Sequence, residues 1–148
     1  MKLSKTKGSI GVLDKDPSKI NIAIVKAKFN YDITEAMETI AIKRLKELGV
    51  NNISSYEVPG SFEIPYACKK ISNNYDAIIA IGCIIEGETD HYKFIAENSS
   101  IGIQKVSIEE QKPIIFGILT VKNNNQAKER INNAVTYAEN AVEMACNF

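Results

Sequence analysis

The sequence has no excess of either charge, because 18 lysine and arginine residues balance 18 aspartate and glutamate residues. Domains that bind nucleic acid usually carry a basic surface, so this balance argues against a nucleic-acid partner. The sequence also lacks any apolar run that approaches the roughly 20 residues of a membrane-spanning helix. Its N-terminus lacks the apolar core of a signal peptide, so we expect a cytoplasmic protein without a membrane partner.

Cysteine is scarce, and the three cysteines are Cys68, Cys83 and Cys146. An odd number without the spacing of metal ligands favours buried thiols over a set of disulfides, and we expect no metal site. Apolar residues make up 45% of the 148 residues, which is ordinary for a globular protein of one domain.

What the sequence does contain is a regular alternation of strand and helix patterns. Apolar runs typical of buried strands cover residues 20–27, 53–58, 77–83 and 114–120. Helical periodicity follows each run: from Thr34 as N-cap to Gly49, through 66–71, over 90–108 with Phe94, Ile95, Ile101 and Val106 facing inward, and over 127–145 as one helix. The pattern predicts a flavodoxin-like, three-layer α/β/α sandwich with a four-stranded parallel sheet.

Residues 1–19 precede the first strand pattern and carry five lysines without a sustained period. We interpret them as an N-terminal arm attached to a single domain over residues 20–148. Weak alternation over residues 9–13 would allow the arm to add an edge strand to a neighbouring subunit.

The turn after the third strand pattern is the most informative stretch. Its spacing, Gly82-x-x-x-x-Gly87-x-Thr89, is that of a P-loop, but Glu88 stands where the phosphate-binding lysine should precede the threonine. A nucleoside triphosphate is therefore not expected. A helix start with free backbone N–H groups and a hydroxyl still suits one phosphate monoester, provided that a cation comes from elsewhere in the protein.

His91, the only histidine of the chain, stands two residues after Thr89. Histidine is the side chain whose charge changes near neutral pH, which suits proton transfer in both directions. The alternative is that Thr89 or Asp90 merely caps the helix and His91 is a surface residue of its first turn. Spacing alone does not decide between these interpretations.

Two other segments should reach the same edge of the sheet, because the carboxyl ends of parallel strands lie together. Phe29 follows the first strand pattern and could stack on a flat heterocycle or fold back onto the core. Glu63 follows the second and could accept hydrogen bonds from ligand hydroxyl groups or simply begin a helix.

Five motifs, in this order, resemble the signatures of the 6,7-dimethyl-8-ribityllumazine synthase family. They are Lys28-Phe29-Asn30, Val58-Pro59-Gly60-Ser61-Phe62-Glu63-Ile64-Pro65, the stretch from Gly82 to His91, Phe116-Gly117-Ile118-Leu119-Thr120 and Gln126-Ala127-Lys128-Glu129-Arg130. The resemblance runs from about Ile20 to Ala145. It implies the penultimate step of riboflavin biosynthesis, in which 5-amino-6-(D-ribitylamino)uracil condenses with L-3,4-dihydroxy-2-butanone 4-phosphate, without a metal or redox cofactor.

The resemblance also implies a role for each matching residue. The substrate-binding positions would be Phe29, Asn30, Ser61, Phe62, Glu63, Cys83, Ile84, Ile85 and Phe116. The phosphate-binding positions would be Glu88, Thr89 and Arg130, and His91 would transfer protons. In this family the site lies between subunits of a homopentamer, so Phe116 and Arg130 would come from the adjacent chain.

The sequence departs from the family pattern after the fourth strand. No lysine follows Arg130, and the segment before the final helix is shorter than in many members. The usual Thr-x-Glu-Asn is Thr120-Val121-Lys122-Asn123, which exchanges an acid for a base. The longer segment is a family feature associated with larger assemblies, and here it is shortened, so we expect a homopentamer rather than a sixty-subunit shell. The Ala- and Val-rich face of the final helix and the N-terminal arm would supply its interfaces.

Two other functions fit parts of this pattern. An archaeal-type riboflavin synthase would share the fold, but His91 and the complete Gly87-Glu88-Thr89 turn favour the lumazine enzyme. A non-catalytic flavin- or lumazine-binding protein would keep Phe29 and Glu63 but would not need His91, Thr89 and Arg130.

Overall fold

A computed structural model describes residues 8–87 and 90–148. The strands are β1 (Asn21–Ala27), β2 (Asn52–Val58), β3 (Ala77–Ile85) and β4 (Ile114–Val121). The α-helices are α1 (Tyr31–Glu47), α2 (Ile64–Ile71), α3 (His91–Glu110), α4 (Asn124–Glu129) and α5 (Asn133–Asn147). Short 3₁₀ turns η1 (Pro17–Lys19), η2 (Ser61–Glu63) and η3 (Ser72–Asn74) complete the order.

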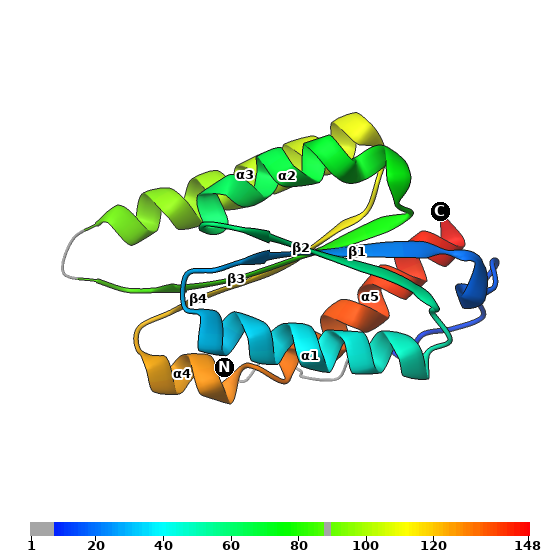
Figure 1. The fold of residues 1–148 in the computed structure, drawn as a ribbon, viewed down its shortest axis with the longest axis horizontal. Coiled ribbons are helices and arrows are strands. Elements are labelled where there is room, and N and C mark those ends of the chain that lie inside the picture. Colours follow the sequence, from blue (N-terminus) through cyan, green and yellow to red (C-terminus); the bar gives the residue numbers. More distant parts are fainter. Residues whose placement is uncertain (1–7, 88–89) are drawn as a thin grey trace.

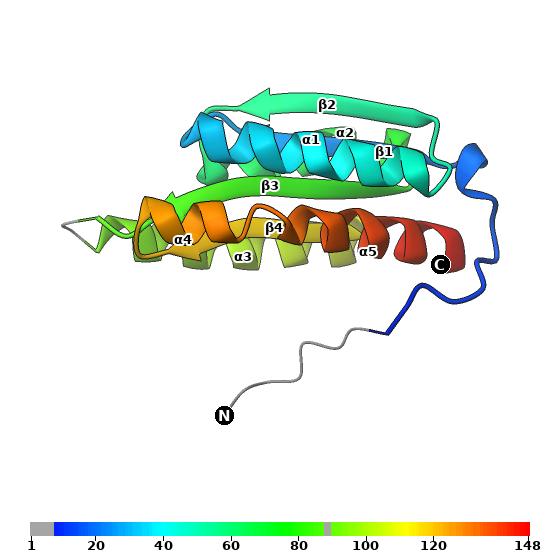
Figure 2. The ribbon, with the colours of Figure 1, turned by 90° about the horizontal axis from the view of Figure 1, so that it is seen from below.

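The four strands form one parallel sheet in the order β2-β1-β3-β4. Helices α2 and α3 cover one face, and α1, α4 and α5 cover the other (Figure 1). The turned view shows α1 running beside α4 and α5, which follow one another end to end (Figure 2). The predicted three-layer α/β/α sandwich is confirmed. Strands β1 and β3 are central and apolar on both faces, as a doubly covered parallel sheet requires.

Each face of the sheet has its own hydrophobic core. Ile22, Ile24 and Ile79 point to the α1 and α5 side, and Val25 and Ile78 point to the α2 and α3 side. This alternation follows from the two-residue period of a strand, which sends successive side chains to opposite faces. The three cysteines are free and buried, as the sequence predicted.

The first helix starts earlier than predicted. Asn30 adopts the left-handed conformation, with φ 56° and ψ 49°, and α1 begins at the next residue. Thr34 is therefore not an N-cap. Its hydroxyl donates to the carbonyl oxygen of Ala27 at 2.8 Å and fastens the first turn of the helix to the end of β1.

Helix α3 turns only part of its predicted face inward, because Val106 is buried and Ile95 packs against the core as predicted. Ser99, Ile103 and Val106 are buried, whereas Phe94 and Ile101 are exposed. The prediction for these last two residues was wrong because α3 carries two apolar stripes, and periodicity does not show which one meets the sheet. The exposed stripe, Phe94, Ile101 and Ile108, repeats every seven residues.

The final helix, predicted as one, is two helices, α4 and α5, because the helical conformation is interrupted between Glu129 and Asn133. The apolar face of α5, made of Ala134, Ala138, Ala141 and Val142, is fully buried against α1 and the sheet of the same chain. That face cannot supply an interface with another subunit, which corrects the expectation from the sequence.

Two residues of the N-terminal region form hydrogen bonds with the end of α5. The backbone N–H of Asp14 donates to Oδ1 of Asn147 at 2.9 Å, and that of Lys15 donates to the carbonyl oxygen of Cys146 at 3.2 Å. Residues 9–13 form no strand within this chain. Their addition to the sheet of a neighbour stays a prediction. Among the described residues, no helix is long and apolar enough to cross a membrane.

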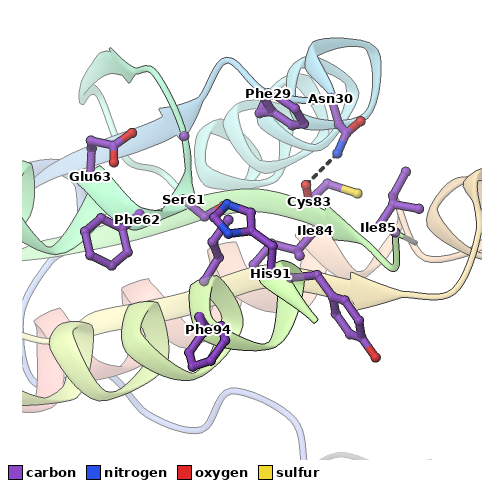
Figure 3. A pocket seen from close by; sticks show the side chains of 14 residues that line it. Phe29, Asn30, Ser61, Phe62, Glu63, Cys83, Ile84, Ile85, His91 and Phe94 are labelled. Carbon is purple, nitrogen blue, oxygen red and sulfur yellow. Dashed lines mark hydrogen bonds between the residues drawn. The ribbon is translucent and has the colours of Figure 1, made fainter. Parts of the chain in front are cut away.

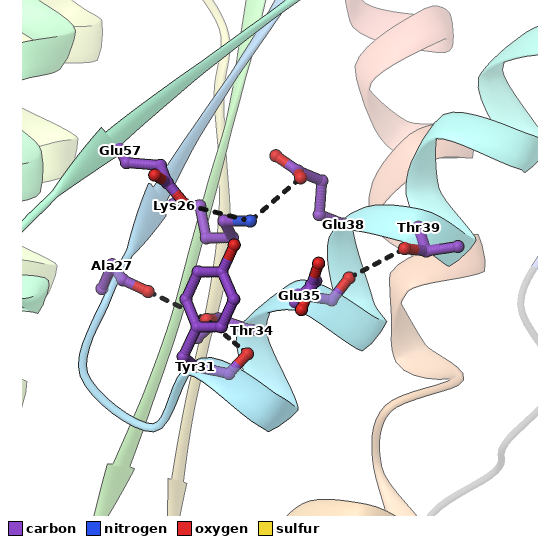
Figure 4. A network of polar contacts seen from close by, with 8 residues as sticks. All are labelled: Lys26, Ala27, Tyr31, Thr34, Glu35, Glu38, Thr39 and Glu57. Atoms are coloured by element: carbon purple, nitrogen blue, oxygen red, sulfur yellow. Dashed lines mark hydrogen bonds and ion pairs between the residues drawn. The ribbon is translucent and has the colours of Figure 1, made fainter.

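A buried lysine near the end of β1 is the least expected feature of the fold (Figure 4). Lys26 is 3% exposed, and its Nζ lies 3.0 Å from Glu38 of α1 and 3.4 Å from Glu57 of β2. The ring of Tyr31 covers it at 4.6 Å from the centroid. These contacts join β1, β2 and α1 through charge, at a position where an apolar side chain would be the common choice.

Candidate active site

A pocket of about 620 Å³ opens at the carboxyl ends of β1 and β3 (Figure 3). Residues from four separate parts of the sequence line it: Phe29, Asn30, Gly60, Ser61, Phe62, Glu63, Cys83, Ile84, Ile85, Gly87, His91, Tyr92, Phe94 and Ile95. In an open α/β sheet, ligands bind at this edge where the strand order reverses, here between β1 and β3.

The aromatic ring of Phe29 stands at one wall of the pocket. The backbone N–H groups of Lys28 and Phe29 donate to the carbonyl oxygens of Val58 and Pro59, at 2.8 and 3.2 Å. These bonds continue the pairing of β1 with β2 beyond the strands. The Phe29 side chain is 72% exposed, so it does not fold back onto the core and is available for stacking.

Asn30 joins this wall to the end of β3. Its Nδ2 donates to the carbonyl oxygen of Cys83 at 2.7 Å (Figure 3). Asparagine tolerates the left-handed backbone better than most residues, so one side chain satisfies both the turn and the carbonyl. The distance between the β1 and β3 sides of the pocket is thereby fixed.

The second wall is the 3₁₀ turn η2, which carries Ser61, Phe62 and Glu63. Ser61 is buried at the pocket floor, and Phe62 is 60% exposed. The carbonyl oxygen of Ser61 accepts the N–H of Ile64, which closes the turn, and also the hydroxyl of Ser99 from α3 at 3.1 Å. The turn is therefore held both by its own backbone and by the neighbouring helix.

The floor comes from β3, which extends two residues further than predicted and includes Ile84 and Ile85. The backbone N–H of Glu86 then donates to the carbonyl oxygen of Val121 at 2.8 Å. Burial, with a smaller contribution from Asp32, raises the pKa of the Cys83 thiol to about 11. Cys83 therefore lines the pocket as a neutral thiol, the less reactive form of cysteine.

His91 begins α3 and belongs to the pocket lining. Asp90, at the N-cap position, makes no side-chain capping bond, and its carboxylate pairs with Lys93 at 3.3 Å. Glu88 and Thr89 lie outside the described residues. The capping interpretation is thus wrong for Asp90, and that of Thr89 stays open.

Several lining residues were not predicted as site residues, namely Gly60, Gly87, Tyr92, Phe94 and Ile95. The last three follow His91 in the first turns of α3, so the predicted start of this helix was the signal that could have identified them as lining residues. Phe116 and Arg130 do not line the pocket of their own chain, among the residues described. Phe116 is 43% exposed on the edge strand β4, and Arg130 is exposed at the end of α4.

Metal coordination has no support in the described side chains. Over residues 8–87 and 90–148, no group of three or more histidine, cysteine, aspartate or glutamate residues could hold a metal ion.

Comparisons with known proteins identify the family of this chain. The model of the 6,7-dimethyl-8-ribityllumazine synthase family matches residues 19–148. Proteins named 6,7-dimethyl-8-ribityllumazine synthase are 40% identical in Coxiella burnetii (strain CbuG_Q212; 86% of this chain and 90% of that protein) and 43% identical in Paracidovorax citrulli (88% and 88%). The Pyrococcus furiosus protein of the same name is 42% identical (87% and 85%).

A solved structure of a lipoprotein fragment from Peptoclostridium difficile 630 shares the fold alone. It superposes with a TM-score of 0.53 at 16% identity, over 85% of this chain and 99% of that one. The family model covers far more than half of the sequence, and the named relatives match over most of their own length. This chain therefore belongs to the 6,7-dimethyl-8-ribityllumazine synthase family.

Proposed function

We propose that the pocket at the carboxyl ends of β1 and β3 holds both substrates of the family's reaction. The chain is an enzyme that condenses 5-amino-6-(D-ribitylamino)uracil with L-3,4-dihydroxy-2-butanone 4-phosphate to give 6,7-dimethyl-8-ribityllumazine, phosphate and water. The observation that carries the proposal is the convergence of the segments at Phe29, Ser61, Cys83 and His91 on one pocket. Cytoplasmic location stays a prediction from the sequence.

The pyrimidine substrate fits the apolar part of this pocket. Phe29 offers an exposed ring for stacking on the uracil, and Cys83, Ile84 and Ile85 add apolar lining at the end of β3. The polar ribityl chain would lie along Ser61, Phe62 and Glu63, where a carboxylate can accept hydrogen bonds from hydroxyl groups.

The phosphate of the second substrate would bind at the start of α3. Gly87 lines the pocket there, and backbone N–H groups at the start of this 20-residue helix favour an anion. Glu88 and Thr89 would contact the phosphate through backbone and hydroxyl groups. The helix dipole contributes only about 0.3–1 kcal/mol, so a cation is needed, and we assign that role to Arg130 of an adjacent subunit.

The chemistry needs orientation and proton transfer. The primary amine of the pyrimidine attacks the ketone, and a first water leaves as an imine forms. Phosphate is then eliminated, and the ribityl-bearing amine attacks the remaining carbonyl and loses a second water as the ring closes. Holding two reactants in a reactive arrangement can give effective molarities of about 10⁵ M or more. His91, at the pocket mouth, would take protons from and return protons to the reacting nitrogen and oxygen atoms.

Family membership implies an oligomer, and we propose a homopentamer with the active site shared between adjacent chains. Phe116 and Arg130 are exposed away from their own pocket and would complete that of a neighbour. The exposed stripe Phe94, Ile101 and Ile108 on α3 offers an apolar surface for this contact in place of the buried face of α5.

Incubation of the purified protein with both substrates tests the reaction. Formation of the fluorescent lumazine is expected. A riboflavin synthase would instead consume the lumazine, and a binding protein would hold it without turnover.

Replacing Arg130 should separate the two substrates. We expect Arg130→Ala to raise the KM for the butanone phosphate about 10- to 100-fold, because charge-assisted hydrogen bonds to phosphate are strong. The KM for the ribitylaminouracil should change little. Lys128→Ala, which removes an exposed cation two residues away on α4, is the matched control. An equal rise in both KM values would contradict the phosphate role.

Mixed assemblies test whether the site is shared. Arg130→Ala and His91→Ala chains, each impaired alone, should regain activity when they are unfolded and reassembled together, because some interfaces then combine an intact Arg130 with an intact His91. Random mixing in a closed ring restores about a quarter of the sites. Light scattering should give the mass of five chains. Lack of recovery at that mass would place both residues in one subunit.

A further inference from the structure

Ser99 is a buried polar residue that the pocket itself does not include. It lies on α3 and is 1% exposed. Its hydroxyl donates to the carbonyl oxygen of Ser61 at 3.1 Å, with both groups inside the protein. Buried polar side chains are uncommon unless they are paired, so this contact between α3 and η2 merits a functional explanation.

The segment from Ser61 to Pro65 is fitted closely against small residues on two elements. A Cβ atom at Gly82 of β3 would lie 2.4 Å from Oγ of Ser61, and one at Gly102 of α3 would lie 2.9 Å from Cγ of Pro65. Ser99 and Gly102 are three residues apart, so they share one face of the helix. That face of α3 holds the segment from Ser61 to Pro65 in place through the hydrogen bond of Ser99 and the close approach of Gly102 to Pro65.

The same helix carries His91 at its first residue. Ser99 follows eight residues later, about 12 Å along the helix axis. A single rigid element thus joins the proton-transfer residue to the wall that would hold the ribityl chain. Any shift of η2 against α3 changes the separation between Ser61 and His91 directly.

We propose that Ser99 is a positioning residue for the pyrimidine substrate. It acts through Ser61 and fixes the turn of Ser61, Phe62 and Glu63 relative to α3, without touching the substrate. The inference rests on the proposed function of the pocket and adds to it a residue that none of the family-like motifs contains.

The hydrogen bonds of Ser61 distinguish positioning from simple stabilisation. Its carbonyl oxygen also accepts the N–H of Ile64, so it keeps one partner when the Ser99 hydroxyl is removed. No acceptor is left buried and unpaired, which is the costly outcome of losing a hydrogen bond. Ser99→Ala should therefore change where the turn lies more than how stable the fold is.

Steady-state kinetics of the assembled enzyme tests this inference. We expect Ser99→Ala to raise the KM for the ribitylaminouracil about three- to tenfold, the range of one net hydrogen bond, with the KM for the butanone phosphate unchanged. Ser99→Cys, which keeps a weak donor of similar size, should give an intermediate KM.

Two serine variants serve as controls. Ser72→Ala removes another buried hydroxyl, which donates to the carbonyl oxygen of Lys69 at 3.1 Å, at the end of α2 away from η2. Ser100→Ala makes the same change at an exposed position on α3. Both should leave both KM values at the wild-type level, because a loss of folded enzyme lowers the maximal rate but not a KM.

The outcomes separate this inference from the function on which it rests. An unchanged KM for the ribitylaminouracil in Ser99→Ala, or an equal rise for both substrates, would overturn the positioning role while wild-type activity still supported the proposed function. A wild-type protein that forms no lumazine would overturn the function itself.

Discussion

We expect His91→Ala to lower kcat by about 10²- to 10⁴-fold and to leave measurable turnover. That range is the usual contribution of a positioned acid and base, and the remaining rate comes from the orientation of the two substrates, which the pocket residues other than His91 would supply. Lumazine fluorescence under saturating concentrations of both substrates measures the effect. The rate of the variant should also depend less on pH than the wild-type rate, because the variant lacks this acid and base.

The matched control for this variant is Lys93→Ala. Lys93 is exposed on the same first turn of α3 and pairs with Asp90, so its replacement perturbs the helix start without removing the imidazole. We expect a nearly wild-type rate. A His91→Ala enzyme with native mass and no detectable turnover would mean that His91 does more than transfer protons.

Glu38→Leu should reduce the free energy of unfolding by about 3 kcal/mol, because it leaves Lys26 buried with only the more distant Glu57 as an anionic partner. Adding Lys26→Met should recover most of this loss. An apolar pair of similar size removes both charges, and Oε2 of Glu38 has no hydrogen-bond partner in the described structure, so the wild-type pairing is incomplete. Urea denaturation of the two single variants and the double variant measures the coupling.

Glu35→Leu is the control for this series, since it places the same substitution on the exposed side of α1, one turn earlier. It should change the free energy of unfolding by less than about 0.5 kcal/mol. Additive effects of Lys26→Met and Glu38→Leu would show that the two residues do not depend on one another.

The ion pairs of Lys26 with Glu38 and Glu57 also determine the pH range in which the protein loses the stabilisation that they provide. Burial lowers the pKa of Lys26, but the hydrogen bonds and charge of Glu38 and Glu57 outweigh burial and hold the pKa above its ordinary value of 10.5. The folded protein therefore binds the proton more tightly than the unfolded chain does. The stabilisation is fully present below pH 10.5 and is lost as the pH rises through the raised value.

The order of strands and helices could be predicted because their patterns are long and strongly apolar. Details that depend on which of several possible partners a side chain contacts could not be predicted. Thr34 has the chemistry of an N-cap, yet the left-handed backbone of Asn30 starts α1 earlier and leaves the threonine hydroxyl to bond Ala27. Lys26 sits in an otherwise apolar strand, and only the folded chain reveals that Glu38 and Glu57 converge on it.

The residues that line the candidate site were more predictable than the residues that hold those lining residues in place. Phe29, Glu63 and His91 stand at the ends or starts of elements, and the parallel topology brings such positions to one edge. Ser99 carried no such signal, because it lies in the middle of a helix and its partner is a backbone carbonyl group. Side-chain to backbone contacts between distant elements leave no pattern in a single sequence.

The strand order has a consequence for synthesis of the chain. Helix α1 covers β1 and part of β3 on one face of the sheet, but the rest of that face, over β3 and β4, packs against α5 at the C-terminal end. At about 5–20 residues per second, several seconds pass between the emergence of β1 and that of α5. Until α5 emerges, the part of this apolar face that lies over β3 and β4 is uncovered, so the nascent chain should bind chaperones on the ribosome and aggregate if translation stops before Asn133.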